Sequence, residues 1–222
     1  MVTDDPGTPG DGRWEINLAF TVEKTATARA IEEPLVDANY GVGDRLQLKL
    51  EAPLLREQGA GSGRRTGLGE SRAGVKWRFY DAGASEWQLS TYPQLVFTTP
   101  VSRTRRAAPN EAATTLLLPL ELERAFGNIA VNVEVGGTVS SRGHGDRIAG
   151  VVVGHQLSEQ FEWMLEVHAD SVDGQSAVLA NIGARWKATA SGTLLVAIGR
   201  DLHNALGEHR ELVGYLGWQI NR

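Results

Sequence analysis

The sequence lacks cysteine, a long apolar run and an excess of positive charge. None of its 222 residues is cysteine, which excludes disulfide bonds and thiolate metal sites and is compatible with an oxidising compartment. No segment approaches the roughly 18 consecutive apolar residues of a membrane-spanning helix. The formal net charge of -5 offers no positive surface for nucleic acid, so no nucleic-acid partner is expected.

The sequence also contains nothing that resembles a linker between two cores. We therefore expect a flexible N-terminal leader over residues 1–12, rich in proline and glycine, and a single domain over residues 13–222. The leader has neither the basic start nor the apolar core of a signal peptide. If the protein is exported, we expect the given chain to start at a mature or misassigned position.

What the sequence does contain is a period of two in hydrophobicity. In residues 14–23, WEINLAFTVE, the even positions are apolar and the odd positions are small, polar or charged. This alternation is typical of a strand with one apolar and one wet face, and about ten residues allow a tilted strand to cross a bilayer. The repeated pattern predicts an all-β fold, a transmembrane antiparallel up-and-down β-barrel of about 12 strands. The expected strands cover residues 14–23, 34–40, 45–52, 72–79, 87–98, 114–123, 129–136, 148–157, 161–168, 178–187, 194–198 and 212–220.

The expected connections alternate in length. Short turns alternate with longer polar loops, among them residues 24–33, 53–71 and 170–176. This asymmetry is typical of outer-membrane barrels, which have short periplasmic turns and longer external loops. Two residues resist the pattern, because Pro93 and Pro119 fall inside expected strands and each removes a ladder hydrogen bond.

All six tryptophans lie near the short-turn ends of their strands and on the apolar parity. Indole rings prefer the membrane interface, which accommodates both an apolar body and a polar N–H group. The sequence therefore predicts a membrane-interface belt. Its members are Trp14, Trp77, Trp87, Trp163, Trp186 and Trp218.

The opposite parity would line the lumen, and its charges are segregated by strand. The expected lumen-lining residues are Arg45, Lys49, Arg72, Lys76, Arg78, Glu121, Glu134, Glu162, Glu166 and Arg185. Opposed basic and acidic walls would set a transverse field across a pore and tune which solutes pass. Alternatively, these charges pair and plug the barrel, for example Glu162 with Arg185 across one hairpin.

Several short motifs resemble a known family. They are TDDPGTPG (3–10) running into WEIN (14–17), YG (40–41) with DRLQL (44–48), LPL (118–120) and NIGAR (181–185). The sequence resembles the outer-membrane proteins of the phenol meta-cleavage degradation pathway. This resemblance implies a β-barrel in the Gram-negative outer membrane that takes up hydrophobic or aromatic compounds, and it brings no catalytic residues with it.

From these patterns we expect an outer-membrane channel for passive passage of small hydrophobic or aromatic solutes. Its partners would be outer-membrane lipid and the solute, with lipopolysaccharide a candidate for Arg64 and Arg65, and the sequence does not indicate the oligomeric state. Two alternatives stay open: a structural or lipid-interacting barrel with a plugged lumen, and a soluble β-barrel that binds a small ligand.

No enzyme, cofactor or metal is expected. The five histidines show no metal-ligand spacing. A lipase-like set would require serine, histidine and an acid within hydrogen-bonding reach in the fold. The candidates Ser140, Ser141, His144 and Asp146 lie too near one another in sequence to be more than a turn-rich loop.

Overall fold

The computed structural model is built from β-strands. It describes residues 1–59, 63–83, 86–97, 114–140 and 145–222. Within these residues, no helix has the length and apolar character needed to span a membrane. The strands are β1 (Trp14–Lys24), β2 (Ala28–Val42), β3 (Leu46–Gly59), β4 (Arg65–Leu68), β5 (Ser71–Asp81), β6 (Gln88–Thr91), β7 (Gln94–Phe97), β8 (Thr114–Phe126), β9 (Ile129–Ser140), β10 (Arg147–Ser158), β11 (Phe161–Val172), β12 (Gln175–Lys187), β13 (Gly192–Asn204) and β14 (Leu212–Asn221).

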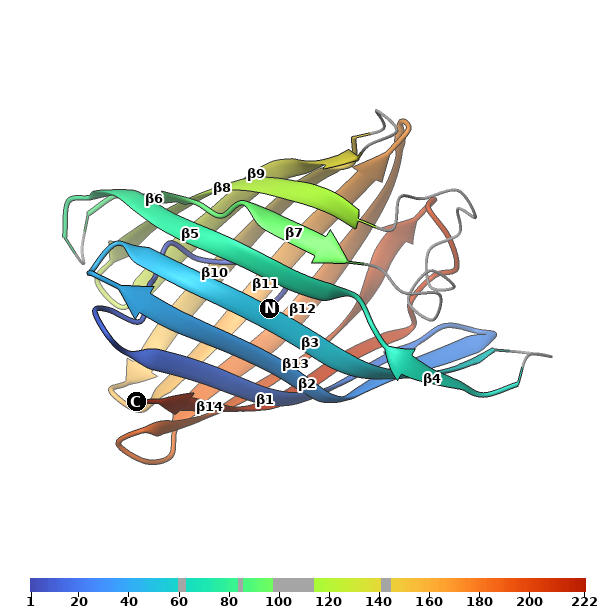
Figure 1. Ribbon diagram of the computed structural model, residues 1–222, viewed down its shortest axis with the longest axis horizontal. Coiled ribbons are helices and arrows are strands. Elements are labelled where there is room, and N and C mark those ends of the chain that lie inside the picture. The colour runs from blue at the N-terminus through green and yellow to red at the C-terminus, as the bar shows by residue number, and fades with distance from the viewer. Residues whose placement is uncertain (60–62, 84–85, 98–113, 141–144) are drawn as a thin grey trace.

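The strands form one closed antiparallel ring (Figure 1). The first and last strands close it, with Glu15 opposite Asn221 and Lys24 opposite Leu212. Strand β4 pairs only with the far end of β3, and β6 and β7 together occupy one position between β5 and β8. The predicted 12-stranded antiparallel barrel is therefore confirmed.

Three of the expected loops were wrong. Residues 25–27 and 173–174 are tight turns, so β1, β2, β11 and β12 are longer than predicted. Asp173 and Gly174 both have positive φ, 49° and 81°, which is the conformation of a two-residue hairpin turn. In the third case, β3 continues to Gly59 and pairs with β4. Polar residues here belong to strands because one face of each strand is wet, so polarity alone does not mark a loop.

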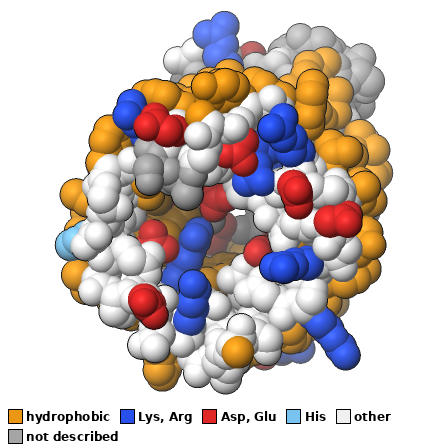
Figure 2. Space-filling model, turned by 90° about the vertical axis from the view of Figure 1, so that its left-hand side faces the viewer, with side chains coloured by type: hydrophobic (Ala, Val, Ile, Leu, Met, Phe, Trp, Pro, Cys, Tyr) orange, Lys and Arg blue, Asp and Glu red, His pale blue; other side chains and the backbone are white. Residues whose placement is uncertain are grey.

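The period of two separates an apolar outer face from a polar inner face. Outward side chains such as Leu50 and Ile198 are 61% and 55% exposed, whereas inward Glu166 is 2% exposed. In the valine run of β10, Val152 points inward, and its neighbours Val151 and Val153 point outward. Figure 2 shows hydrophobic side chains around the outside and charged side chains around a hollow at one end.

The two prolines that resisted the strand pattern lie next to each other in the wall. The chain leaves strand geometry at Tyr92 and Pro93, between β6 and β7, and this break faces Pro119 of β8. The carbonyl of Pro119 accepts hydrogen bonds from the Tyr92 amide, at 3.3 Å, and from the Thr91 hydroxyl, at 2.8 Å. These two prolines, which lack a backbone N–H donor, thus lie at the same break, so the ladder hydrogen bonds of the rest of the wall are not interrupted by them.

The ring of Tyr92 braces the inner wall at this break. It has no exposed surface, and its hydroxyl contacts Asn39 of β2, at 3.5 Å, and the side-chain amide of Gln47 of β3, at 3.0 Å. The ring passes over Gly74 of β5, where an added Cβ would lie 3.2 Å from a ring carbon. One aromatic side chain therefore spans four neighbouring strand positions.

Replacing Tyr92 by alanine is expected to lower the free energy of unfolding by about 3–5 kcal/mol, because a fully buried aromatic ring leaves a cavity when it is removed. The measurement is the guanidinium midpoint of the barrel folded in detergent. Tyr80→Ala is the matched control, since Tyr80 lies on β5 with 49% of its surface exposed. Equal shifts for the two variants would contradict the bracing role.

Candidate functional site

Residues 1–13, here called the inner segment, run inside the barrel. From sequence most of this stretch was expected to be a flexible leader, but it has fixed contacts with the wall. Gly10 and Gly12 have φ of +89° and +65° and turn the chain inward before β1. At the rim, the Gly12 amide donates to the carbonyl of Gly41 at 3.1 Å. A Cβ added to Gly41 would lie 1.9 Å from the carbonyl oxygen of Gly10, so only glycine permits this approach.

Deeper in the lumen, the inner segment contacts β10 and β11. The amides of Val2 and Thr3 donate to Oε1 of Glu166, at 2.8 and 2.6 Å. The Thr3 hydroxyl lies 3.2 Å from Nδ1 of His168. Gly150 of β10 provides the space, because a Cβ there would lie 2.0 Å from Thr3 Oγ1. The segment is therefore fitted to the wall at both ends.

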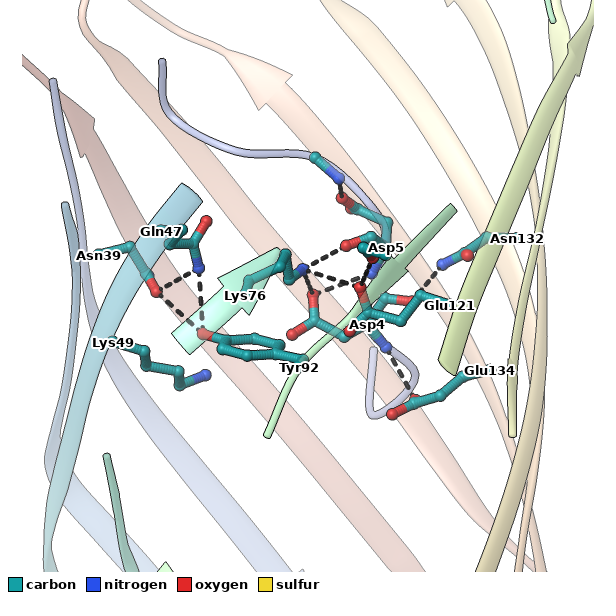
Figure 3. A network of polar contacts seen from close by, with 12 residues as sticks. Asp4, Asp5, Asn39, Gln47, Lys49, Lys76, Tyr92, Glu121, Asn132 and Glu134 are labelled. Carbon is teal, nitrogen blue, oxygen red and sulfur yellow. Dashed lines mark hydrogen bonds and ion pairs between the residues drawn. The ribbon is translucent and has the colours of Figure 1, made fainter. Parts of the chain in front are cut away.

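The centre of the site is the ammonium group of Lys76, on β5 (Figure 3). Its side chain is 2% exposed, and Nζ lies 3.0 Å from Asp4 of the inner segment and 3.3 Å from Glu121 of β8. Nζ also donates to the carbonyl of Asp5. A buried ammonium without counter-charge is strongly destabilising. The carboxylates of Asp4 and Glu121 and the carbonyl of Asp5 compensate the charge of the buried ammonium.

Asp4 is held on three sides. Besides the ion pair with Lys76, its amide donates to Glu134 at 3.1 Å, and its carbonyl accepts from the Asn132 side chain at 2.6 Å. Burial opposes ionisation of Asp4, but the charges of Lys76 and Lys49 outweigh it and hold the pKa of Asp4 below its ordinary value. Asp4 is therefore a carboxylate at neutral pH, and its contact with Lys76 is a true ion pair.

Other basic residues of the wall pair with acids on the same or neighbouring strands. Lys49 lies 3.4 Å from Asp37 and 3.0 Å from Glu51. Arg185 lies 3.8 Å from Glu162, its register partner, and this is the hairpin pair given above as an example of the alternative in which lumen charges pair. The wall over β2 and β3 is thus mixed in sign, and not uniformly basic, since Asp37 and Glu51 interrupt it.

The expected lumen residues are not all brought together. Lys76, Glu121 and Glu134 lie around the inner segment in Figure 3. Two further expected residues contact it: Glu166 accepts backbone N–H groups of the segment, and Arg185 lies 3.6 Å from Asp5. The side chains of Lys49, Arg72, Arg78 and Glu162 form ion pairs along the wall. Arg45 is different: it lies in the turn before β3 and is exposed, so it was wrongly included.

Sequence reasoning missed the inner segment itself, together with Tyr92, Asn132 and His168. A signal was present in the charges of the leader, because Asp4 and Asp5 are consecutive acids upstream of a strand pattern with inward lysines. The inner wall also carries apolar side chains, which the polar parity did not suggest. Those buried on inward positions include Val96, Leu117, Val152 and Leu179.

The tryptophans lie toward the end of the barrel where β1 begins and β14 ends. Exposed fractions are 44% for Trp14, 52% for Trp77, 40% for Trp87, 51% for Trp186 and 37% for Trp218. Trp163 is half-buried and packs edge-on against His155, with centroids 5.9 Å apart. Contact of this belt with lipid stays a prediction.

The structure describes only part of the turn-rich loop that holds the serine and histidine candidates. Ser141 and His144 of the turn-rich loop lie outside the described residues. Among the residues that the structure does describe, no group of three or more histidine or acidic side chains is placed to hold a metal ion.

Comparison with known proteins places the fold. Neither a protein-family model nor a curated protein sequence matches the chain. The crystal structure of the COG4313 outer membrane channel from Pseudomonas putida F1 is similar with a TM-score of 0.77 and 14% identity, and the match covers 100% of both chains. The NanC porin, at TM-score 0.66 and 9% identity, and the KdgM porin in complex with disordered oligogalacturonate, at 0.62 and 7%, each match 92% of this chain and 98% of their own. At these identities the comparison shows the fold alone: the chain has the fold of outer-membrane channels.

Proposed function

We propose that the protein is a channel of the Gram-negative outer membrane that passes small hydrophobic or aromatic solutes passively. The observation that carries this proposal is the placement of the side chains, which is opposite to that in a water-soluble protein. Large apolar side chains are exposed on the outside of the barrel, and charged side chains surround an interior hollow (Figure 2). A water-soluble barrel would not expose leucine, valine and tryptophan over its whole girth. The fold shared with known channels supports the same conclusion.

The outer surface supports a membrane location. Strands of 10 to 15 residues are long enough to cross the apolar layer when tilted. Outer-membrane lipid is the proposed partner of the apolar face, and the exposed Arg64 and Arg65 beside β4 are candidates for lipopolysaccharide phosphates.

Two features of the inner wall support an aromatic or hydrophobic solute. The ring of Tyr92 and the apolar side chains of Val96, Leu117 and Val152 lie on the inward side of the wall and are buried with the segment seated. The family that the sequence resembles is also associated with aromatic compounds. No bond-making step is proposed.

A second candidate function is a structural barrel with a closed lumen. The inner segment favours it, because residues 3–6 cross the interior and Thr3 and Pro6 are buried there. Removal of the segment would open a conducting lumen in a channel but not in a structural barrel. The conductance of a deletion variant therefore distinguishes the two functions.

The purified chain, refolded into detergent, is expected to run faster on a gel before boiling than after, since a closed hydrogen-bonded ring stays compact in the absence of heat. Far-ultraviolet circular dichroism of the unboiled sample checks that it is β-rich. A chain that remains folded and monomeric in buffer without detergent would contradict the membrane assignment and favour the soluble ligand-binding barrel.

Deletion of residues 2–9 is expected to raise single-channel conductance in planar bilayers several-fold over the full chain, because the segment and its contacts no longer narrow the lumen. Glu208→Gln is the matched control: Glu208 lies in the exposed connection after β13, far along the chain from any segment contact, and should leave conductance unchanged. A deletion variant that folds but does not conduct would favour the structural barrel.

A further inference from the structure

The buried ammonium of Lys76 is shared between the wall and the inner segment. Its wall partner is Glu121, at 3.3 Å, and its segment partners are the carboxylate of Asp4, at 3.0 Å, and the carbonyl of Asp5. Only Glu121 belongs to the ring of strands. When the segment leaves, Lys76 loses a carboxylate and a carbonyl together. Because a buried ammonium needs compensating charge, the vacated position favours another carboxylate.

A second cation of the wall, Arg185, is likewise shared between an acid of the wall and an acid of the inner segment. Arg185 lies 3.6 Å from Asp5 of the segment and 3.8 Å from Glu162 of the wall. The wall acids Glu134 and Glu166, by contrast, accept backbone N–H groups of the segment. The segment is thus bound through its two carboxylates at the cations and through its amides at the acids.

An aromatic ring lies beside the Lys76 ammonium. Nζ is 4.6 Å from the centroid of the Tyr92 ring, within the range of a cation–π contact. The same ring covers Gly74 and shields that part of the wall. The position therefore has a cation for a carboxylate with an aromatic ring next to it. With the segment seated this ring has no exposed surface, and Asp4 uses only the cation.

We propose that Lys76 is a carboxylate-binding site of the lumen, filled by Asp4 when the inner segment is seated and by the carboxylate of a small aromatic acid when the segment is displaced. This rests on the proposed channel function and narrows its solute class to aromatic carboxylates. A solute shifts such an equilibrium only if it binds one state more tightly. Aromatic acids meet this condition because the Lys76 position becomes available only after Asp4 leaves.

The test follows the segment with a single thiol, since the natural chain has none. Thr3→Cys places a thiol where the side chain is buried against His168 and Gly150. In lipid nanodiscs, where both ends of the lumen are accessible, the rate of labelling by a bulky polar maleimide measures how often the segment leaves. Benzoate is expected to raise this rate about tenfold, and the neutral isostere benzamide to leave it unchanged.

Three variants control the experiment. Thr27→Cys, in the exposed turn between β1 and β2, should label at the same rate with and without benzoate. Asp4→Asn keeps the wall intact and should raise the basal rate while removing most of the benzoate effect, because the competing carboxylate is gone. Lys76→Met combined with Glu121→Gln removes both members of the buried pair and should abolish the benzoate effect.

Two results would overturn the proposal. One is labelling of Thr3→Cys that benzoate does not change. The other is acceleration by benzylamine instead of benzoate, which would place the solute on Glu134 and Glu166. Both results are distinct from failure of the channel function, which is read from the ionic conductance of the deletion variant in the absence of any aromatic solute.

Discussion

The closed ladder of backbone hydrogen bonds is the constraint on which the rest of the structure depends. In lipid no water is available to unpaired amides and carbonyls, so a sheet can cross only if its edges meet. Strands β1 and β14 meet over ten residue pairs, from Glu15 to Lys24. Closure commits one face of every strand to the outside, and the period of two then sends every second residue inward. The polar lumen follows from closure.

A lumen that is formed by closure of the sheet must hold many charged side chains in a narrow space. The wall solves most of this locally, because cations such as Lys49 and Arg185 have acids on a neighbouring strand. Lys76 differs from these cations, since its wall partner Glu121 lies two strand positions away. The second carboxylate comes from the inner segment. The segment is therefore part of the electrostatic balance of the barrel as well as an obstacle in its lumen.

The alternation in the sequence was sufficient to predict the strands of the barrel, but not the segment that lies inside its lumen. Alternation identifies an outward and an inward parity within each strand, which is a local property, and it located Lys76, Glu134 and Glu166 on the inward parity. Strand ends were harder, because the polar residues of β2 near Glu32 can belong either to a loop or to the wet face. The folding of the leader into the lumen depends on contacts more than a hundred residues away, such as Asp4 with Asn132. No local pattern encodes these.

The wall and the inner segment differ in how firmly they are held. The wall is a continuous ladder whose rupture would leave many backbone groups without hydrogen bonds. The segment instead is held by individual hydrogen bonds and ion pairs to side chains of the wall, such as those of Glu166 and Lys76, and each of these can be replaced without breaking the ladder. Gly41 and Gly150 show that the wall is shaped to receive it, since a side chain at either position would collide with the segment. The site is thus fitted to an element that can leave without disturbing the ladder, and these are the conditions under which local opening is separable from global unfolding.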